Sequence, residues 1–362
     1  MQINHHWTKE EILDIYNLPL MELLYRAASV HRQFHDPNTV QVSTLLSIKT
    51  GGCPEDCGYC PQAARYHTDI EGNELMSVQQ VKAQALRAKA SGSSRVCMGA
   101  AWRNVKDGPE FDQVLEMVRT INKLDMEVCC TLGMITENQA KRLSEAGLYA
   151  YNHNLDSSED YYKEVISTRA YQDRLDTIAN VRKTNVTVCS GGIIGMGESL
   201  EDRAGMLVAL ASLIPQPESV PINALVPVEG TPLAEQEKVS IWEMLRMVAT
   251  TRIVMPKTQV RLSAGRTEMS REGQAMCFFA GANSIFAGDK LLTTPNPDVN
   301  EDMEMFKQLG LNPQKAFAKH PQPHSVSAEE SAYQALGEKP KWTRPGHKIE
   351  RNLEAQGKKE KS

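Results

Sequence analysis

Apolar and polar positions follow two alternating periods along the chain, and these periods predict its elements. Apolar runs of strand length, rich in β-branched residues, lie near residues 40–50, 94–100, 127–133, 148–156, 186–195, 219–228, 258–265 and 284–288. Helical spacing of apolar residues fills the segments between them, most clearly over 111–124, 206–213 and 241–254. Eight strands alternating with helices is the number that a closed (β/α)8 barrel requires. We therefore expect an α/β fold, a TIM-type barrel over residues 39–315.

The two ends of the chain differ from this pattern. Thr8 and Glu11 have the spacing of a capping box, and helical periodicity then continues to about His35, which predicts an N-terminal helical extension over 1–38. His31 and His35 lie four residues apart on that helix, and we expect them on a solvated face. Residues 316–362 are expected to be a disordered, basic C-terminal tail.

Composition and charge exclude several classes of protein. With 41% hydrophobic and 23% charged residues the chain has the composition of a globular protein, and it contains no apolar stretch of transmembrane length. The first seven residues lack the apolar core of a signal peptide, so we expect a cytoplasmic protein. The net charge is −5, and because the last 26 residues are basic, the remainder is more acidic still. We expect no nucleic-acid partner and no membrane partner.

Three of the eight cysteines form a tight group, Cys53, Cys57 and Cys60, directly after the first predicted strand. Three thiolates can bind three irons of a 4Fe–4S cluster and leave the fourth iron open to an outside ligand, whereas a ferredoxin supplies four cysteines. A structural zinc site is the alternative. It would need a fourth protein ligand, for which the nearest histidine is His67.

A second group of cysteines is spread over the predicted strands, with Cys97 in the second, Cys129 in the third and Cys189 in the fifth. Side chains alternate between the two faces of a strand, so Cys129 and Cys130 cannot both point into the barrel. Cys130 is expected to be a core residue, as is Cys277. One inward cysteine from each of three strands indicates a metal site.

Polar residues in and after two other strands predict a binding site. Asn152, Asn154 and Asp156 have the period of two that places them on one face, where three buried polar groups would be costly without a ligand. The glycine-rich segment 191–198 would allow a flat ligand such as adenine to approach the backbone closely.

The cysteine loop, with Tyr59 before its third cysteine, resembles the signature of the radical S-adenosylmethionine superfamily. Over about residues 8–312 the chain also resembles the biotin synthase family, through the segments 97–102, 129–133, 151–156, 189–192, 220–223 and 260–265. The resemblance implies a sulfurtransferase that inserts sulfur between two saturated carbons of dethiobiotin, the last step of biotin biosynthesis. It implies that 5′-deoxyadenosyl radicals derived from S-adenosylmethionine start the reaction.

The resemblance also implies roles for single residues. Cys53, Cys57 and Cys60 would bind the 4Fe–4S cluster, with S-adenosylmethionine on the open iron. A 2Fe–2S cluster, the family's proposed sulfur donor, would be bound by Cys97, Cys129, Cys189 and Arg261. From the residues alone, Arg261 would instead be a buried ion-pair partner, because guanidinium is normally a cation. The residues implied for S-adenosylmethionine are Tyr59, Ala100, Asn154, Asp156, Arg174, Ile193 and Gly195, and those for dethiobiotin are Asn152, Asn154 and Asn223.

The partners implied by the resemblance are a reductant of the flavodoxin or ferredoxin type, iron–sulfur assembly proteins and a second copy of the chain. Two other functions are weighed against this one. Another radical enzyme on the same barrel would lack the second set of ligands, Cys97, Cys129, Cys189 and Arg261. A non-enzymatic iron–sulfur carrier would have a fourth cysteine near Cys60 and no inward Asn/Asp strand.

Overall fold

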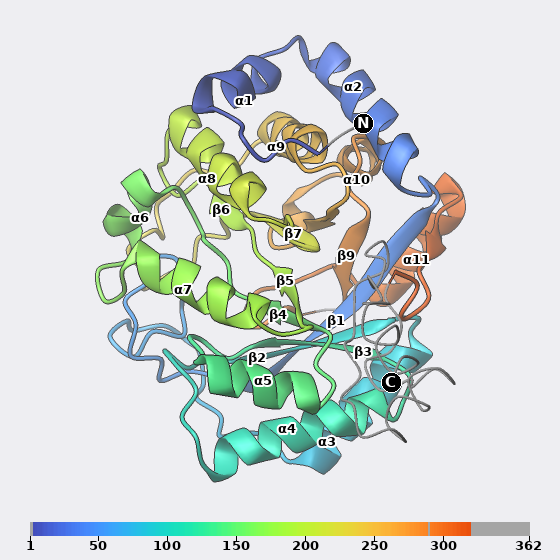
Figure 1. Ribbon diagram of the computed structural model, residues 1–362. Coiled ribbons are helices and arrows are strands. Elements are labelled where there is room, and N and C mark those ends of the chain that lie inside the picture. Colours follow the sequence, from blue (N-terminus) through green and yellow to red (C-terminus); the bar gives the residue numbers. More distant parts are fainter. Residues whose placement is uncertain (1–2, 289, 320–362) are drawn as a thin grey trace, which may run out of the picture.

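The chain forms a closed barrel of parallel strands surrounded by helices, as a computed structural model of residues 3–288 and 290–319 shows (Figure 1). Its eight barrel positions follow the chain order and close where the last strand pairs with the first. The strands are β1 (Thr39–Lys49), β2 (Arg95–Ala100), β3 (Glu127–Thr131), β4 (Ala150–Asn152), β5 (Thr187–Cys189), β7 (Ser219–Ala224), β8 (Gln259–Leu262) and β9 (Ser284–Ala287). The predicted TIM-type fold is therefore confirmed.

Helices cover the outside of the barrel and pack their apolar faces against it (Figure 1). Most of them begin at a Ser or Thr whose hydroxyl accepts a hydrogen bond from the first turn, as the capping rule requires. They are α3 (Val78–Ala90), α4 (Pro109–Asn122), α5 (Glu137–Glu145), α6 (Glu159–Val165), α7 (Tyr171–Arg182), α8 (Leu200–Ser212), α9 (Ile241–Val254), α10 (Arg271–Phe279) and α11 (Val299–Leu309), with a 3₁₀ turn at Arg266–Glu268.

The strand expected over 186–195 is broken in two, into β5 and β6 (Gly192–Ile194), and β6 pairs with β7. The break lies at Gly191, whose backbone approaches the carbonyl of Pro221 so closely that a Cβ would come within 2.0 Å of its oxygen. A Cβ on Gly192 would come within 2.0 Å of the sulfur of Met206. Glycine is therefore required sterically at both positions, where the chain changes direction at the mouth of the barrel.

The N-terminal extension consists of two helices, α1 (Lys9–Tyr16) and α2 (Leu20–Phe34), separated by a turn that ends at Pro19. The capping box at Thr8 is confirmed. The expected solvated face for the two histidines is wrong, because α2 packs against α9. His31 is buried, and the ring of His35 contacts the carbonyl oxygen of Pro256 at 2.9 Å.

A C-terminal segment, residues 312–319, crosses the N-terminal end of the barrel. Its strand β10 (Asn312–Pro313) pairs with the start of β1, and the Gln314 N–H donates to the Val40 carbonyl at 2.7 Å. Further along, the Phe317 ring meets the Tyr149 ring edge-on at 5.9 Å, and Lys319 Nζ lies 3.2 Å from a nitrogen of His35. The rest of the expected tail lies outside the described residues.

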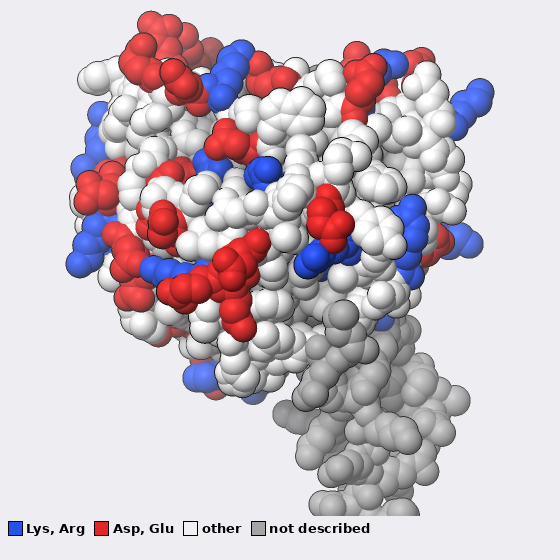
Figure 2. Space-filling model, turned by 90° about the horizontal axis from the view of Figure 1, so that it is seen from above, with Lys and Arg blue, Asp and Glu red and all other residues white. Residues whose placement is uncertain are grey.

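Acidic and basic side chains are interspersed over the face of the molecule seen in Figure 2, which also shows blue and red groups side by side. The exposed ion pairs of the molecule include Lys9–Asp160 and Lys238–Glu268. Among the described residues, no helix combines the length and the apolar character needed to cross a bilayer.

The buried His31 and the half-buried His35 predict a loss of stability in weak acid. Burial, together with the charge of Arg252, lowers the pKa of His31 to about 3 and that of His35 to about 2. The unfolded chain binds protons at these rings below about pH 6.5, whereas the folded chain does not, so stability is lost as the pH falls. We expect the free energy of unfolding to drop by about 2 kcal/mol per histidine between pH 7 and pH 5.

Urea denaturation at the two pH values measures this loss. A His31→Asn/His35→Asn variant should be less sensitive to acid by the contribution of both rings. An unchanged pH dependence in that variant would contradict the assignment.

Candidate active site

The loop that carries Cys53, Cys57 and Cys60 follows β1 at the carboxyl end of the barrel, where the catalytic groups of such barrels lie. Backbone hydrogen bonds hold it compact: the Cys60 N–H donates to the Cys57 carbonyl at 2.9 Å, and the Ala64 N–H donates to the Cys53 carbonyl at 2.7 Å. Burial raises the pKa of Cys57 to about 12 and that of Cys60 to about 11, so these thiols ionise only when a cation replaces the proton.

The three cysteines of this loop do not form a site for a single metal ion. The ligands of one zinc ion must all lie about 2.0–2.3 Å from it, and no group of three His, Cys, Asp or Glu side chains in the described part of the chain converges in that way. The three cysteines of a cluster each bind a different iron, so their thiols lie farther apart. All three are free of disulfides and neighbour one another on a single loop.

Two acidic residues between the first two cysteines fasten this loop to the segment before α7. Asp56 accepts hydrogen bonds from the backbone N–H groups of Ser167 at 2.9 Å and Thr168 at 3.0 Å, and from both of their hydroxyls. Glu55 accepts from Nε and Nη2 of Arg169, at 3.2 and 2.9 Å. These contacts fix the position of the loop relative to α7.

The inner cysteines lie together inside the barrel, below the loop. Cys97 and Cys129 are directly opposite each other in register on β2 and β3, and both are buried in one interior cluster, while Cys130 packs into the core around the barrel. Arg261 enters from β8, with its Nη1 3.8 Å from Cys189 Sγ. Burial alone would raise the pKa of Cys97, but a hydrogen bond with Cys129 and the charge of Arg261 lower it to about 7.

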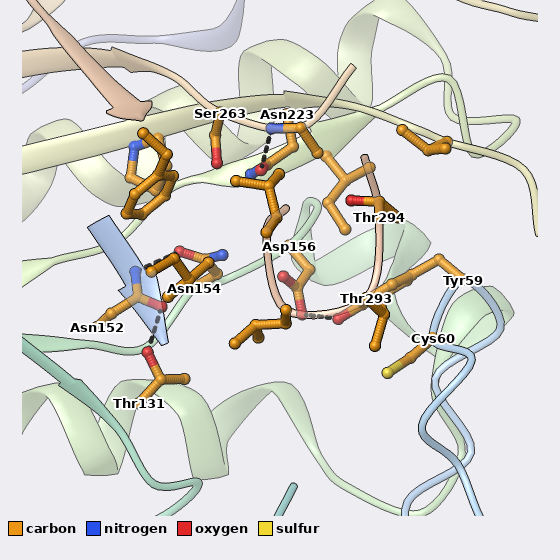
Figure 3. Close-up of a pocket in the computed structure, with 18 of the residues that line it drawn as sticks. Tyr59, Cys60, Thr131, Asn152, Asn154, Asp156, Asn223, Ser263, Thr293 and Thr294 are labelled. Carbon is orange, nitrogen blue, oxygen red and sulfur yellow. Dashed lines mark hydrogen bonds between the residues drawn. The ribbon is translucent and has the colours of Figure 1, made fainter. Parts of the chain in front are cut away.

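A cavity of about 260 Å³ connects the two groups of cysteines, close to the size of pockets that hold small ligands. Cys60 lines it at one side, and Cys97, Cys129 and Arg261 line its deeper part. Figure 3 shows polar side chains that line the cavity together with Cys60. Those that the sequence predicted are Tyr59, Asn152, Asn154, Asp156, Ile193 and Asn223.

An ion pair at the mouth joins three of the predicted residues. Arg174 Nη2 lies 2.5 Å from Asp156 Oδ2, and the hydroxyl of Tyr59 donates to the same oxygen at 2.7 Å. Arg174 also donates to the backbone carbonyl of Asn154 at 2.8 Å. This arginine is buried, in contrast to the surface position that is usual for a helical arginine. It therefore presents a fixed positive charge beside the cysteine loop.

The amides beneath the mouth orient one another. Asn152 accepts from the hydroxyl of Thr131 and donates to Asn154 Oδ1, both at 3.1 Å, and its Nδ2 lies 3.3 Å from Cys189 Sγ. Asn223 donates to the Gly192 carbonyl at 2.9 Å and accepts from the Ala264 N–H at 3.2 Å. These side chains are held in place before any ligand binds.

Six predicted site residues lie outside the cavity lining: Cys53, Cys57, Ala100, Arg174, Cys189 and Gly195. Ala100 is the last residue of β2, and Gly195 follows β6, where its N–H donates to Glu198 at 2.9 Å. Five polar residues of the lining were not predicted: Gln62, Thr131, Ser263, Thr293 and Thr294, of which Figure 3 labels the last four. Thr131 and Ser263 could have been found by counting, since each lies two positions after an inward residue, Cys129 and Arg261.

Two family models match successive parts of the chain. Residues 47–210 match the Radical SAM superfamily, and residues 221–312 match the Biotin and Thiamin Synthesis associated domain. The biotin synthase of Christiangramia forsetii is 86% identical over 98% of both chains, and that of Flavobacterium psychrophilum is 82% identical over 98% of both. The chain belongs to the biotin synthase family.

As a biotin synthase, it is an enzyme, a radical S-adenosylmethionine sulfurtransferase that converts dethiobiotin to biotin. Biotin synthases use a 4Fe–4S cluster and S-adenosylmethionine, and carry an additional 2Fe–2S cluster. Among solved structures, methylornithine synthase superposes with a TM-score of 0.71 at 17% identity, covering 91% of this chain and 96% of that one. The FeFe-hydrogenase maturase HydG of Carboxydothermus hydrogenoformans gives 0.73 at 17% identity, covering 92% and 82%. These two likenesses show the shared fold.

The contacts of Asp56 predict a strong effect of its removal. Asp56→Ala leaves two backbone N–H groups and the Ser167 hydroxyl without their acceptor, while the Thr168 hydroxyl keeps Glu55. We expect unfolding in denaturant to require about 3 kcal/mol less free energy. Limited proteolysis should also cut the loop 53–67 faster. The exposed Asp69, altered to Ala, is the matched control, and equal effects of the two substitutions would contradict this role.

Proposed function

We propose that Cys53, Cys57 and Cys60 bind the 4Fe–4S cluster of this biotin synthase, and that Cys97, Cys129, Cys189 and Arg261 bind its 2Fe–2S cluster. One observation carries the proposal: a single cavity reaches from Cys60 to Cys97, Cys129 and Arg261. A substrate in it would contact both groups of ligands. The alternative for Arg261, a buried ion pair, lacks support, since its hydrogen-bond partners in the described part of the chain are all neutral.

S-adenosylmethionine, in this proposal, binds at the mouth through Tyr59, Ala100, Asn154, Asp156, Arg174, Ile193 and Gly195. Arg174 supplies a buried positive charge for a carboxylate, and Asp156 supplies acceptor oxygens for a ribose diol. When bound next to the cluster, S-adenosylmethionine supplies the 5′-deoxyadenosyl radical that abstracts hydrogen from unactivated carbon. The protein's own contribution is to hold the polar groups in fixed positions and to keep water out.

Dethiobiotin is assigned to the deeper half of the cavity, against Asn152, Asn154 and Asn223. A ureido ring has two N–H donors and one carbonyl acceptor, and carboxamide side chains offer both kinds of partner. Thr131 and Gly192 already hold the side chains of Asn152 and Asn223 in place. Binding of dethiobiotin to these two amides therefore costs little additional side-chain entropy. The saturated carbons of the substrate would then lie between the two groups of cysteines.

The remaining features of the proposal come from the family. We infer a cytoplasmic homodimer with a reductant of the flavodoxin or ferredoxin type, and iron–sulfur assembly proteins as further partners. We also propose a division into an extension over 1–38, a catalytic barrel over 39–315 and a tail from 316, of which Phe317 and Lys319 still contact the barrel and the extension. Both family matches fall within residues 39–315, which supports that boundary.

The proposed inner site predicts the iron and sulfide content of a variant that lacks one of its cysteines. Cys97→Ala, after reconstitution, should hold about two irons and two sulfides fewer per chain, because a 2Fe–2S cluster is lost while the 4Fe–4S cluster stays. Cys130→Ala is the matched control, since Cys130 neighbours Cys129 in sequence but faces the other way. Iron and sulfide analysis measures both, and unchanged counts in Cys97→Ala would refute the assignment.

The reaction itself is tested with the reconstituted protein. We expect 5′-deoxyadenosine and biotin to form when dethiobiotin, S-adenosylmethionine and a reductant are added. Omitting dethiobiotin should lower the yield of 5′-deoxyadenosine, since substrate commits the radical to hydrogen abstraction. Absence of 5′-deoxyadenosine under the complete conditions would contradict the proposed site.

A further inference from the structure

The guanidinium of Arg261 is held from two sides inside the barrel. Its Nε donates to Ser284 Oγ at 2.8 Å, and its Nη2 donates to Gln41 Oε1 at 2.9 Å, with Ser43 Oγ farther away at 3.5 Å. Among the described contacts of the guanidinium, only Nη1 approaches a cysteine, and it lies 3.8 Å from Cys189 Sγ. The arginine is 1% exposed, so water cannot replace these partners. The orientation of the guanidinium is therefore decided by Gln41 and Ser284.

The carboxamide of Gln41 has an oxygen end and a nitrogen end, and its neighbours decide which end faces Arg261. Gln41 Nε2 points at Glu127 Oε2, 3.5 Å away, and a carboxylate can only accept. Ser284 donates its hydroxyl to Gln41 Oε1 at 3.1 Å, while the same hydroxyl oxygen accepts from Arg261. The oxygen end is thus directed at the arginine by two independent contacts.

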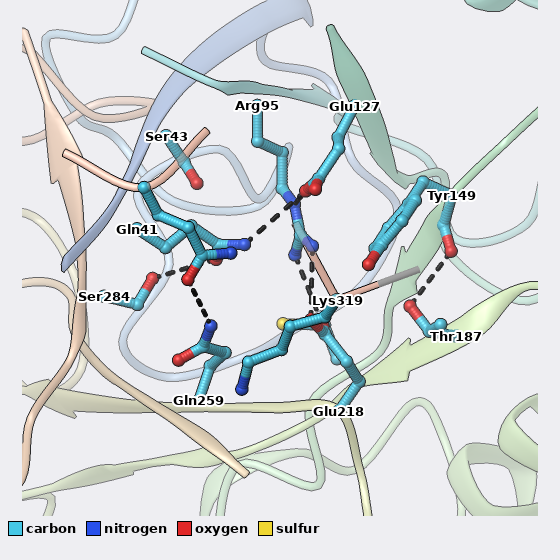
Figure 4. Close-up of polar contacts among 12 residues, drawn as sticks. Gln41, Ser43, Arg95, Glu127, Tyr149, Thr187, Glu218, Gln259, Ser284 and Lys319 are labelled. Carbon is cyan, nitrogen blue, oxygen red and sulfur yellow. Dashed lines mark hydrogen bonds and ion pairs between the residues drawn. The ribbon is translucent and has the colours of Figure 1, made fainter. Parts of the chain in front are cut away.

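Glu127 is itself held in place by contacts at the N-terminal end of the barrel, among them the ion pair with Arg95 in Figure 4. Arg95 Nε donates to Glu127 Oε2 at 2.7 Å, and the backbone N–H of Phe317 donates to Glu127 Oε1 at 2.7 Å. Arg95 also contacts Glu218, at 3.3 Å. Both carboxylate oxygens of Glu127 therefore have a strong donor, and the residue cannot turn away from Gln41.

We propose that Gln41, Ser284 and Glu127 are positioning residues, and that they select Nη1 as the nitrogen of Arg261 that faces the inner cysteines. Glu127 sets the carboxamide of Gln41, and Gln41 with Ser284 sets the guanidinium. The inference rests on the proposed role of Arg261 as a ligand of the 2Fe–2S cluster. An arginine without these partners could present any of its three guanidinium nitrogens to the cluster. The fourth ligand of the inner site would then have no defined position.

The test uses Gln41→Leu and Ser284→Ala in the full-length, reconstituted protein. We expect the visible absorption and circular dichroism of the inner cluster to change, and its loss to an iron chelator to become about tenfold to a hundredfold faster, as for other outer-shell substitutions. Iron remaining in the 4Fe–4S cluster should be unaffected. Ser284→Ala removes a single oxygen, so it keeps the test informative if Gln41→Leu fails to fold.

Gln259→Leu is the matched control, because Gln259 is equally buried at the same end of the barrel but donates to Gln314 and does not contact Arg261. It should retain the spectrum and the chelation rate of the unaltered protein. If Gln259→Leu and Gln41→Leu lose the cluster equally, the effect comes from altered side-chain packing at the N-terminal end of the barrel. The inference is then overturned.

A second comparison separates this inference from the proposed function. If Arg261→Met alters the spectrum of the inner cluster while Gln41→Leu and Ser284→Ala do not, the positioning role is wrong and the ligand role stands. If Arg261→Met leaves both the spectrum and the chelation rate unchanged, the ligand role fails, and the positioning role fails with it.

Discussion

The pairing of β1 with β9 closes the sheet, and the arrangement of the site depends on that closure. Ser284 of β9 lies opposite Gln41 of β1 on one side and opposite Arg261 of β8 on the other. In a closed parallel barrel, alternate residues of every strand point inward, and all carboxyl ends meet at one mouth. Cys60 of the loop and the inner Cys97 and Cys129 therefore face one cavity at two depths, although up to 69 positions separate them in the chain.

The interior of this barrel is polar where many barrels carry layers of Val, Ile and Leu. Buried cations must be compensated, and Arg95 and Arg174 each have a buried carboxylate within 2.7 Å. Arg261 differs, because its described hydrogen-bond partners are neutral oxygen and sulfur atoms and its guanidinium lies 4.6 Å over the Phe286 ring. Stability thus comes mainly from the apolar layer between strands and helices, which leaves the inside of the barrel available for chemistry.

Sequence periodicity predicted the parts of the structure that depend on local geometry. The strand positions and the opposite faces of Cys129 and Cys130 follow from a repeat of two residues, which the barrel preserves. The ion pair between Arg174 and Asp156 could be suggested by family resemblance, but its geometry depends on how α7 packs after the cysteine loop. The burial of His31 was missed because a helix shows its packed face only once its neighbour is known. Gln41 gives no sequence signal at all, since its role arises from residues 86 and 220 positions away.

The segment that crosses the N-terminal end of the barrel has a consequence for biosynthesis. Residues 312–319 are translated after every strand of the barrel, yet Phe317 supplies one of the hydrogen bonds that fix Glu127. This end of the barrel therefore cannot be completed until residues 312–319 have been synthesised.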